Sequence, residues 1–450
     1  MKKLIGKKDL KFILFLIFVH AIFFTMALLY KRIYNGDSFE YVYMALNMKE
    51  KGWFYAGNPA LPVVTEYLTL RPPLYSAILA LVYVFVVNNW VVIVLQNLVS
   101  IFNILVLRRT IRVLGYKRKY DYIFVALIML YPAQFIHANT LAPDIFLQTC
   151  TVLYFYQFVM LIKKREWKYA LYMSITLVLG FLVKPVLYPF SWVHCIILLA
   201  VATRFKLGLL RFSLVSVIPL IVLMLYMSWN HSRTGKAHFS STQSFNAIYY
   251  YYFYFADKNG VGEARAFLQH ERQTLDSIPV FNDRYDYANE KGVSLLKANF
   301  MPYMSYHLMH SARLLVNPGK GEMDLFIGRE TLGGLYTTPN ESFATAINKH
   351  GVTGLSQYIA ANPTLAFAMV VAVFNFFRLI SLSIFLFHRK ISIWIRLFTA
   401  GFVCYFIIMA GPIENTRYFI PVSLIAIGGA TLGFQHVLKR YRNKSIIANN

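Results

Sequence analysis

Charged residues are scarce in this sequence, and their scarcity decides the class of protein. Only 14% of the 450 residues are charged and 58% are hydrophobic, whereas about a quarter of the residues in an average soluble protein are charged. The three cysteines, Cys150, Cys195 and Cys404, all lie inside apolar segments, which excludes a disulfide framework. The sequence also lacks a Gly-rich loop of the kind that holds nucleotide phosphates. A polytopic membrane protein remains.

Basic residues outnumber acidic ones and give a net charge of +25, but their distribution argues against nucleic acid as a partner. They lie in short clusters between apolar runs rather than on one polar face. Such clusters stay on the cytoplasmic side of a membrane and orient the chain in the bilayer. The clusters are the N-terminal lysines and residues 108–119, 163–168, 204–211, 389–396 and 439–444.

Ten apolar runs are long enough to cross a bilayer, which takes about 17 to 25 residues per helix. They lie at 12–30, 90–107, 121–137, 143–162, 168–184, 186–203, 211–229, 364–387, 393–411 and 418–437. The run at 74–87 is short for a crossing, and a crossing there would divide the basic clusters between the two sides. We therefore predict a juxtamembrane or re-entrant helix at 74–87, with both termini cytoplasmic.

This topology divides the chain into four parts. We predict a transmembrane module at 1–229, whose first outer loop is 31–89, C-terminal spans at 364–438 and a cytoplasmic tail at 439–450. The outward segment 230–363 is too long for a connector and contains helical patterns, so we predict a small α-rich domain or lid. Its entrance at 246–255 is almost entirely tyrosine and phenylalanine, which suits packing, a membrane interface, or stacking on a sugar or head group.

Isolated acids gather at the predicted outer ends of the spans. Asp37 and Glu40 follow the first span one helical turn apart, so a helix there presents both carboxylates on one side, where they can position a hydroxyl nucleophile. A helix cap for Asp37 and a solvated surface for Glu40 are the alternatives. Glu66 is a third acid in the same loop, where a surface role is also open. Asp144 opens a later span shortly after His137, and a helix cap is its alternative.

Three basic residues, Arg71, Lys184 and Arg417, lie on the predicted outer side, against the positive-inside pattern. Pairing with Glu414 or Asp144 is one explanation. Phosphate recognition is the other, because arginine offers phosphate a bidentate fork and lysine a compact charge. A cationic subsite beside a carboxylate subsite favours group transfer from a lipid phosphate to a hydroxyl.

Four segments in chain order carry a resemblance: Gly36-Asp37-Ser38 with Tyr41, Ala45 and Leu46; Arg71-Pro72-Pro73-Leu74-Tyr75; Thr234-Gly235 with Phe239-Ser240-Ser241 and Asn246; and Arg417-Tyr418-Phe419-Ile420-Pro421. Together they resemble the GT-C glycosyltransferases that use polyprenyl-phosphate sugars, a family that includes the aminoarabinose lipid A transferases and the protein O-mannosyltransferases. The aminoarabinose transferases carry an acid directly before the basic-Pro element, where this chain has Leu70. The second catalytic acid therefore stays open among Glu40, Glu66 and Asp144.

The resemblance implies an all-α polytopic GT-C fold with about ten transmembrane helices, juxtamembrane helices in the first outer loop and a small α-rich extracytoplasmic domain. It implies a catalytic role for Asp37, a donor-phosphate contact for Arg71 and a second phosphate contact for Lys184. We also expect a catalytic role for Glu40 and substrate contacts for Asp144, Arg417, Tyr418, Glu66, His137 and Tyr75. The expected partners are a polyprenyl-phosphate sugar, a cell-envelope glycan, lipid or protein acceptor, and the bilayer of a bacterial plasma (inner) membrane. No cofactor is required, although clustered carboxylates leave a divalent metal open.

The expected reaction is inverting displacement at the anomeric carbon, on the extracytoplasmic face. A transporter or flippase for a lipid-linked saccharide is an alternative, but transporters place polar residues near mid-span and show repeats, which this sequence does not. An oligosaccharide polymerase or ligase is the other alternative, and it would take a pyrophosphate-linked donor. The sugar and the acceptor stay open.

Overall fold

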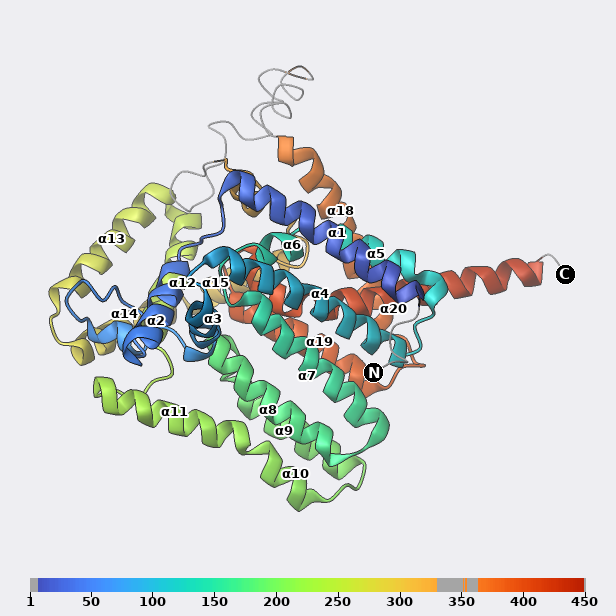
Figure 1. The fold of residues 1–450 in the computed structure, drawn as a ribbon, viewed down its shortest axis with the longest axis horizontal. Helices are drawn as coiled ribbons and strands as arrows, with labels where there is room; N and C mark the ends of the chain where they lie inside the picture. Colours follow the sequence, from blue (N-terminus) through green and yellow to red (C-terminus); the bar gives the residue numbers. More distant parts are fainter. Residues whose placement is uncertain (1–6, 330–350, 352, 354–362, 449–450) are drawn as a thin grey trace.

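The structure is a computed structural model that describes residues 7–329, 351, 353 and 363–448. All regular elements in these ranges are helices. Figure 1 shows a bundle of long helices with a smaller helical unit at one end. The expected lid at 230–363 is therefore described as far as residue 329, and the lysines Lys2 and Lys3 and the last residues of the expected tail, 449–450, lie outside the described residues.

Within the described residues, eight segments are long and apolar enough to cross a membrane, so the protein is a multi-pass membrane protein. Six of them are single helices and two are joined pairs. They comprise α1 (Lys7–Tyr30), α4 (Asn89–Val113), α7 (Asp144–Lys164), η3 (Pro185–Leu187) with α9 (Phe190–Arg204), α10 (Leu209–Ser216) with α11 (Ile218–Thr234), α18 (Pro363–Leu386), α19 (Ile393–Ala410) and α20 (Ile420–Ala448).

Two of the ten expected spans differ from the expectation. Residues 121–137 form two helices, α5 (Asp121–Met129) and α6 (Ala133–Ala138). The break lies at 130–132, because Pro132 lacks a backbone N–H group and disfavours a helical conformation at Tyr131. The helix α8 (Trp167–Val183) has 17 residues and ends before Pro185. The run at 74–87 is α3 (Pro73–Phe85), a helix of 13 residues that begins at a proline.

The basic clusters meet at one end of the bundle. Asp9 at the start of α1 accepts hydrogen bonds from Arg108 at 2.9 Å and Arg118 at 2.9 Å. The side chain of Lys163 donates to the carbonyl of Val113, which joins the ends of α7 and α4. Figure 1 shows α12–α14 at the left, and the α7–α8 and α9–α10 connections away from them at the lower right. The cytoplasmic orientation of the basic end stays a prediction.

The helix α20 lies at the centre of the bundle, in contact with α4, α7 and α18. Its glycines allow this close packing. A Cβ atom on Gly433 would come within 1.9 Å of the Ser381 carbonyl oxygen of α18, and one on Gly428 within 2.7 Å of Leu107 of α4. Small residues let helix backbones approach each other inside a membrane.

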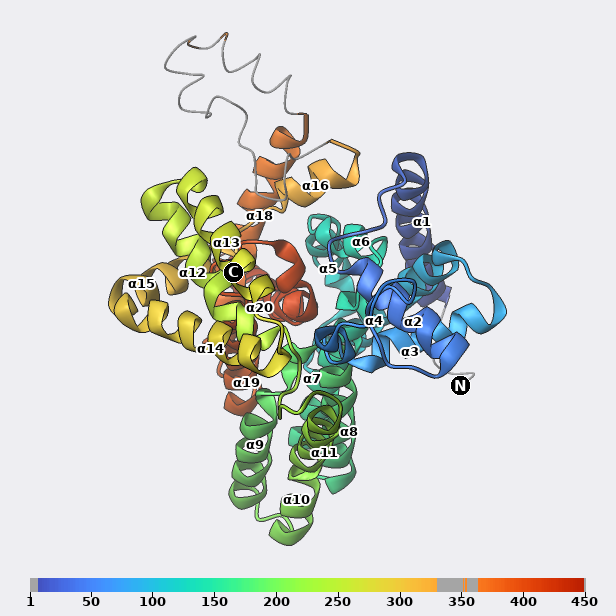
Figure 2. The ribbon, with the colours of Figure 1, turned by 90° about the vertical axis from the view of Figure 1, so that its left-hand side faces the viewer.

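The end of the bundle opposite the basic clusters, named the outer end after its predicted orientation, is built from the first loop and the segment after α11. The first loop contains α2 (Ser38–Lys51), η1 (Thr65–Leu68) and α3, and the later segment contains α12 (Gln243–Asn259), α13 (Val261–Ser277), α14 (Phe281–Ala298), α15 (Phe300–Arg313) and α16 (Lys320–Phe326). Figure 2 views this end directly, with α2 and α3 on one side and α12–α15 on the other. The two parts are joined by hydrogen bonds, for example from the Ser240 hydroxyl to the Leu70 carbonyl at 2.8 Å.

The aromatic run at 246–255 lies on α12 and has two roles in the structure. Tyr251 and Tyr254 pack with Tyr303 and Tyr306 of α15 in a buried cluster inside the outer domain. Tyr249, on another face of α12, lines a cavity instead. The run therefore serves both as core and as a cavity wall, because a helix turns neighbouring side chains to different faces.

Candidate active site

A cavity of about 900 Å³ opens at the outer end, between the first loop, α12–α14 and the ends of several spans. One part of its lining is apolar and comes from the spans: Leu147, Pro185, Val186, Phe406, Met409, Ala410, Ile413 and Pro421. Another part is polar and aromatic and comes from the outer domain: Ser241, Thr242, Gln243, Ser244, Asn246, Tyr249 and Tyr285. The charged residues Asp37, Glu40, Arg71, Lys184 and Arg417 also line it. The cavity is thus amphipathic.

Asp37 is placed by the turn that precedes α2. The Asn35 side-chain oxygen accepts a hydrogen bond from the Asp37 backbone N–H at 3.0 Å. The buried Ser38 hydroxyl donates to the carbonyl of Leu141 at 2.7 Å and ties this turn to the start of α7. The Asp37 side chain makes no capping hydrogen bond to α2. The capping alternative is therefore wrong, and the carboxylate is directed to the cations of the cavity.

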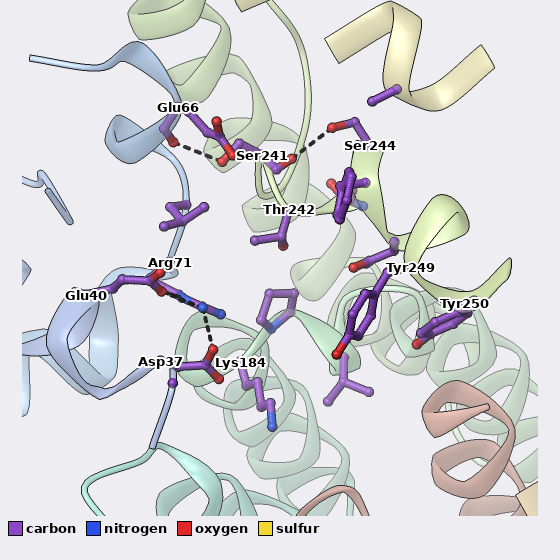
Figure 3. A pocket seen from close by; sticks show the side chains of 18 of the residues that line it. Asp37, Glu40, Glu66, Arg71, Lys184, Ser241, Thr242, Ser244, Tyr249 and Tyr250 are labelled. Carbon is purple, nitrogen blue, oxygen red and sulfur yellow. Dashed lines mark hydrogen bonds and ion pairs between the residues drawn. The ribbon is translucent and has the colours of Figure 1, made fainter. Parts of the chain in front are cut away.

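Two arginines hold the Asp37 carboxylate. Arg71 Nη2 donates to its Oδ1 at 2.8 Å, and Arg417 Nη1 donates to its Oδ2 at 2.6 Å. Arg71 also donates to Glu40 through Nε at 2.5 Å. Figure 3 shows the Arg71 side chain between the two carboxylates, with Lys184 close to Asp37. Asp37 and Glu40 therefore share one guanidinium, as their spacing of one helical turn predicts.

Asp144 extends these ion pairs into a continuous chain. It accepts from Arg417 Nε at 2.7 Å and from Lys184 Nζ at 2.7 Å, and it has no exposed surface. Acids and bases alternate in this series of ion pairs, in the order Glu40, Arg71, Asp37, Arg417, Asp144, Lys184. The pairing alternative for the three cations is therefore seen in the structure. Phosphate recognition also stays open, because these ion pairs do not use every N–H group of the three cations.

Two cations keep hydrogen-bond donors to spare. Arg417 Nη2 is buried and has no partner in the described part of the chain. Lys184 makes one hydrogen bond, to Asp144, and its ammonium lies 5.1 Å from the centre of the Tyr418 ring. A buried N–H group without an acceptor is costly. Both residues line the cavity, so this unused capacity to donate hydrogen bonds favours an anionic ligand there.

Burial and neighbouring charges shift the pKa values of Asp37 and Glu40 in opposite directions. Burial alone would raise the pKa of Asp37, but Arg417 and Arg71 outweigh it and hold that pKa well below the usual range. Burial raises the pKa of Glu40 above its usual value, and Arg71 offsets this only in part. Asp37 therefore stays ionised, while Glu40 accepts a proton more readily. Pairs of acids separated in this way are typical of acid–base sites.

Local sequence explains how the cations are presented. Lys184 has an extended backbone, with φ −152° and ψ 137°, because Pro185 disfavours a helical conformation at the residue before it. Pro72 follows Arg71 in the same way and is itself extended. The backbone N–H of Arg417 donates to the Asn415 side chain at 2.9 Å, which caps the short turn that carries it.

The remaining predicted residues lie at different distances from this cluster. Tyr418 lines the cavity, as does Glu66, whose carboxylate is 3.8 Å from Arg284 of α14. Tyr75 is fully buried and donates its hydroxyl to Gln96 at 2.7 Å, so it lies behind the cavity. His137 is also buried outside the lining, and neither ring nitrogen has a hydrogen-bond partner among the described residues.

Several lining residues were not expected from the sequence. Figure 3 shows Tyr249 of α12 across the cavity from Asp37 and Lys184. Arg272 and Arg284 line it from α13 and α14. The tyrosine-rich run was a signal for Tyr249, although not for which tyrosine faces inward. The two arginines gave no signal, because charged residues on the helices of an outer domain usually face water.

The carboxylates show no arrangement typical of a metal site. Within the described ranges, no group of three or more His, Cys, Asp or Glu side chains is placed to hold a metal ion. Asp37 and Asp144 each have two cationic partners instead. The independence from metal ions stays a prediction.

The fold and the cavity define a multi-pass helical membrane protein with a charged, partly apolar cavity at one end of its spans. No protein-family model and no curated protein matches the sequence. Among solved structures, the chain is similar to the archaeal oligosaccharyltransferase AglB from Archaeoglobus fulgidus, in complex with an inhibitory peptide and a dolichol-phosphate. The match covers 99% of this chain and 52% of that chain, with 12% sequence identity and a TM-score of 0.49. The chain thus spans about half the length of that protein.

Proposed function

We propose that this protein is an integral membrane glycosyltransferase that transfers a sugar from a polyprenyl-phosphate donor to a hydroxyl group on the extracytoplasmic face. One observation carries the proposal: spare donors on Arg417 and Lys184 adjoin an apolar wall at the ends of the spans. Lys184 is followed directly by Pro185 and Val186, which belong to that wall. A lipid phosphate offers a charge for the donors and an isoprenoid chain for the wall.

The proposed reaction is a single displacement. The acceptor oxygen attacks the anomeric carbon, the bond from that carbon to the phosphate oxygen breaks, and polyprenyl phosphate leaves with the electron pair. Arg417, Lys184 and Arg71 stabilise the negative charge on the departing phosphate. Because one displacement reverses the configuration at the carbon, the product has the inverted anomeric configuration.

The two carboxylates take different parts in this scheme. Asp37, which stays ionised, accepts a hydrogen bond from the acceptor hydroxyl and orients it. Glu40 has the higher proton affinity and takes the proton as the new bond forms. Among the three acids open as the second carboxylate, Glu40 is supported by its shared contact with Arg71. Glu66 pairs with the outer domain, and Asp144 lies behind the cations.

The outer domain contributes to the same reaction by excluding water. Helices α12, α13 and α14 supply lining residues such as Tyr249, Arg272 and Tyr285. Because hydrolysis of the donor competes with transfer, a covered cavity protects the sugar until the acceptor binds. The acceptor is a hydroxyl of a cell-envelope glycan, lipid or protein, and the membrane is the bacterial plasma membrane.

Transfer from a radiolabelled polyprenyl-phosphate sugar tests the proposal. Purified protein in lipid is given the donor and a membrane extract, and both donor binding and loss of label from the donor are followed. Asp37→Asn should lower transfer by roughly 10²–10⁴-fold, as for loss of a group that handles the acceptor proton or its position, while donor binding persists. Asp286→Asn is the matched control, because Asp286 pairs with Lys236 of the outer domain and does not line the cavity.

Arg417→Gln tests the phosphate subsite separately. This substitution removes the unpaired N–H group of Arg417. We expect the affinity for the polyprenyl-phosphate sugar to fall by roughly 10–100-fold, the usual contribution of hydrogen bonds to a charged group. Donor binding without transfer by the unmodified protein would contradict the proposal and favour transport or a pyrophosphate-linked donor. Transfer that survives Asp37→Asn would keep the class and reject the role of Asp37.

A further inference from the structure

A second cavity, of about 290 Å³, lies at the basic end of the bundle, where α4 and α7 end and α19 begins. Nine residues line it: Leu114, Ile162, Lys163, Arg165, Phe205, Lys390, Ile391, Ser392 and Ile395. Three of them are cations and five are apolar, and none is an acid. Nothing in the proposed transfer reaction uses this cavity.

The cavity lies at the depth of the lipid head groups. Four candidate spans end or begin beside it, at Val113, Lys164, Arg204 and Ile393. Since the ends of transmembrane helices mark the boundary between hydrocarbon and head groups, the lining residues are at that boundary. Ile393 and Leu397 of α19 are exposed next to it, at 49% and 63%, as expected for side chains in contact with acyl chains.

The three cations of this cavity have no acidic partner. Within the described ranges, no carboxylate lies within 4 Å of Lys163, Arg165 or Lys390. The acids at this end are engaged elsewhere: Asp9 and Asp121 with Arg108, Arg112 and Arg118, and Glu166 with Lys168. Among the described residues, no acid neutralises the positive charge of this cavity.

Two of the three cations are also held in place. The Lys163 ammonium donates to the Val113 carbonyl, and the Arg165 guanidinium lies 4.8 Å above the centre of the Phe205 ring. Arg165 ends α7 in the left-handed conformation, with φ 59°. Ser392 precedes the first turn of α19, so the positive end of a helix of 18 residues adds to the three charges.

We propose that this cavity binds the phosphate of an anionic phospholipid from the adjoining leaflet, with an acyl chain along the exposed Ile393 and Leu397 of α19. A phosphodiester neutralises the cations, and the apolar residues accept the glycerol backbone and the upper part of the chains. A zwitterionic lipid fits less well, because its own ammonium group is repelled by the three cations. The site is independent of the transfer reaction and does not rest on it.

Lipid retention tests this proposal. The protein is purified from vesicles of phosphatidylcholine alone or mixed with phosphatidylglycerol, and native mass spectrometry counts the lipid that stays bound. We expect bound phosphatidylglycerol and a higher melting temperature in the mixed vesicles. The variant with Lys163→Gln, Arg165→Gln and Lys390→Gln should bind phosphatidylglycerol on the order of 100-fold more weakly, because each basic residue near the surface contributes about 1 kcal/mol.

Two controls keep the outcome decisive. A variant with Lys49→Gln, Lys51→Gln and Lys258→Gln removes the same charge from residues outside the cavity and should retain the lipid. Lys390→Gln alone, at an exposed position, guards against misfolding of the triple variant. Equal retention by the triple variant and the unmodified protein would overturn the proposal. So would an equal stabilisation by inorganic phosphate in phosphatidylcholine, because the ligand would then be free phosphate.

Discussion

At the scale of single residues, the candidate site depends on how cations are shared. Arg71 serves both Asp37 and Glu40, and Arg417 serves both Asp37 and Asp144. Asp37 and Asp144 therefore have two positive partners each, whereas Glu40 has one. The pKa of Asp37 is lowered, whereas that of Glu40 is raised. Two acids one helical turn apart thus acquire different chemistry from their surroundings.

The raised pKa of Glu40 predicts the pH dependence of transfer. A protonated Glu40 cannot accept the proton of the acceptor, so the rate should fall as the pH drops through a pKa above the usual value for glutamate. Asp37 does not contribute to this limb, because its pKa lies well below the usual range. The measurement is kcat/KM against pH for the unmodified protein and for Glu40→Gln.

Glu40→Gln should lower the rate by roughly 10²–10⁴-fold and remove the acidic limb. Glu50→Gln is the matched control, because Glu50 lies on the same helix, α2, and is exposed. It should leave both the rate and the limb unchanged. If the limb persists in Glu40→Gln, another acid receives the proton, and Glu66 becomes the first candidate.

At the scale of elements, the turn that carries Arg417 is held by the outer domain. The buried Glu322 of α16 accepts hydrogen bonds from Thr416, from its N–H at 2.7 Å and its hydroxyl at 3.0 Å. The Asn317 side chain donates to the carbonyl of Glu414 in the same turn. The segment after α11 therefore covers the cavity and also positions one of its cations.

Helix packing around α20 gives a prediction at the same scale. In Gly433→Ala the new Cβ would meet the backbone oxygen of Ser381 at 1.9 Å, so α18 and α20 must move apart. We expect a loss of about 1–3 kcal/mol in the free energy of unfolding, the usual cost of overpacking. Thermal unfolding in lipid measures it.

Gly401→Ala is the matched control, because a Cβ on Gly401 of α19 has no neighbour within 4 Å. It should leave stability unchanged or raise it by up to about 1 kcal/mol, since alanine favours a helix more than glycine does. Equal losses in the two variants would show that the contact between α18 and α20 is not tight.

At the scale of the whole molecule, charge separates the two ends of the bundle. The basic clusters meet at one end, while the opposite end carries a balanced set of acids and cations around the large cavity. Since basic loops usually remain in the cytoplasm, we predict that the basic end of the bundle is cytoplasmic. The cavity should then open to the extracytoplasmic side, where lipid-linked sugars would meet their acceptors.

Cysteine accessibility tests this orientation. With Cys150, Cys195 and Cys404 replaced, a single cysteine is introduced by Glu263→Cys on α13 or by Lys164→Cys at the end of α7. A membrane-impermeant maleimide should label the first in intact cells and the second only after permeabilisation. Labelling of both in permeabilised cells is the control, and the reverse pattern would contradict the orientation.

Much of this architecture could be predicted from the sequence. The membrane class, all eight spans and the short helix at 73–85 follow from hydropathy and proline positions, which are local properties of the chain. The location of Asp37, Arg71 and Arg417 at the same end follows from a topology that places their loops on one side. The break at 130–132 inside an expected span was missed, because its apolar residues mask the effect of Pro132.

The rest was decided by the tertiary structure. Hydropathy is a property of neighbouring residues in the sequence. Ion pairs depend on the distance in space between segments, and Asp37 and Arg417 are 380 positions apart in the sequence. Only the fold shows that Arg71 joins Glu40 to Asp37, that Tyr75 lies behind the cavity, and that Tyr249 faces it. The sequence by itself determined which residues lie at the outer end, and the packing of helices determined which of them meet.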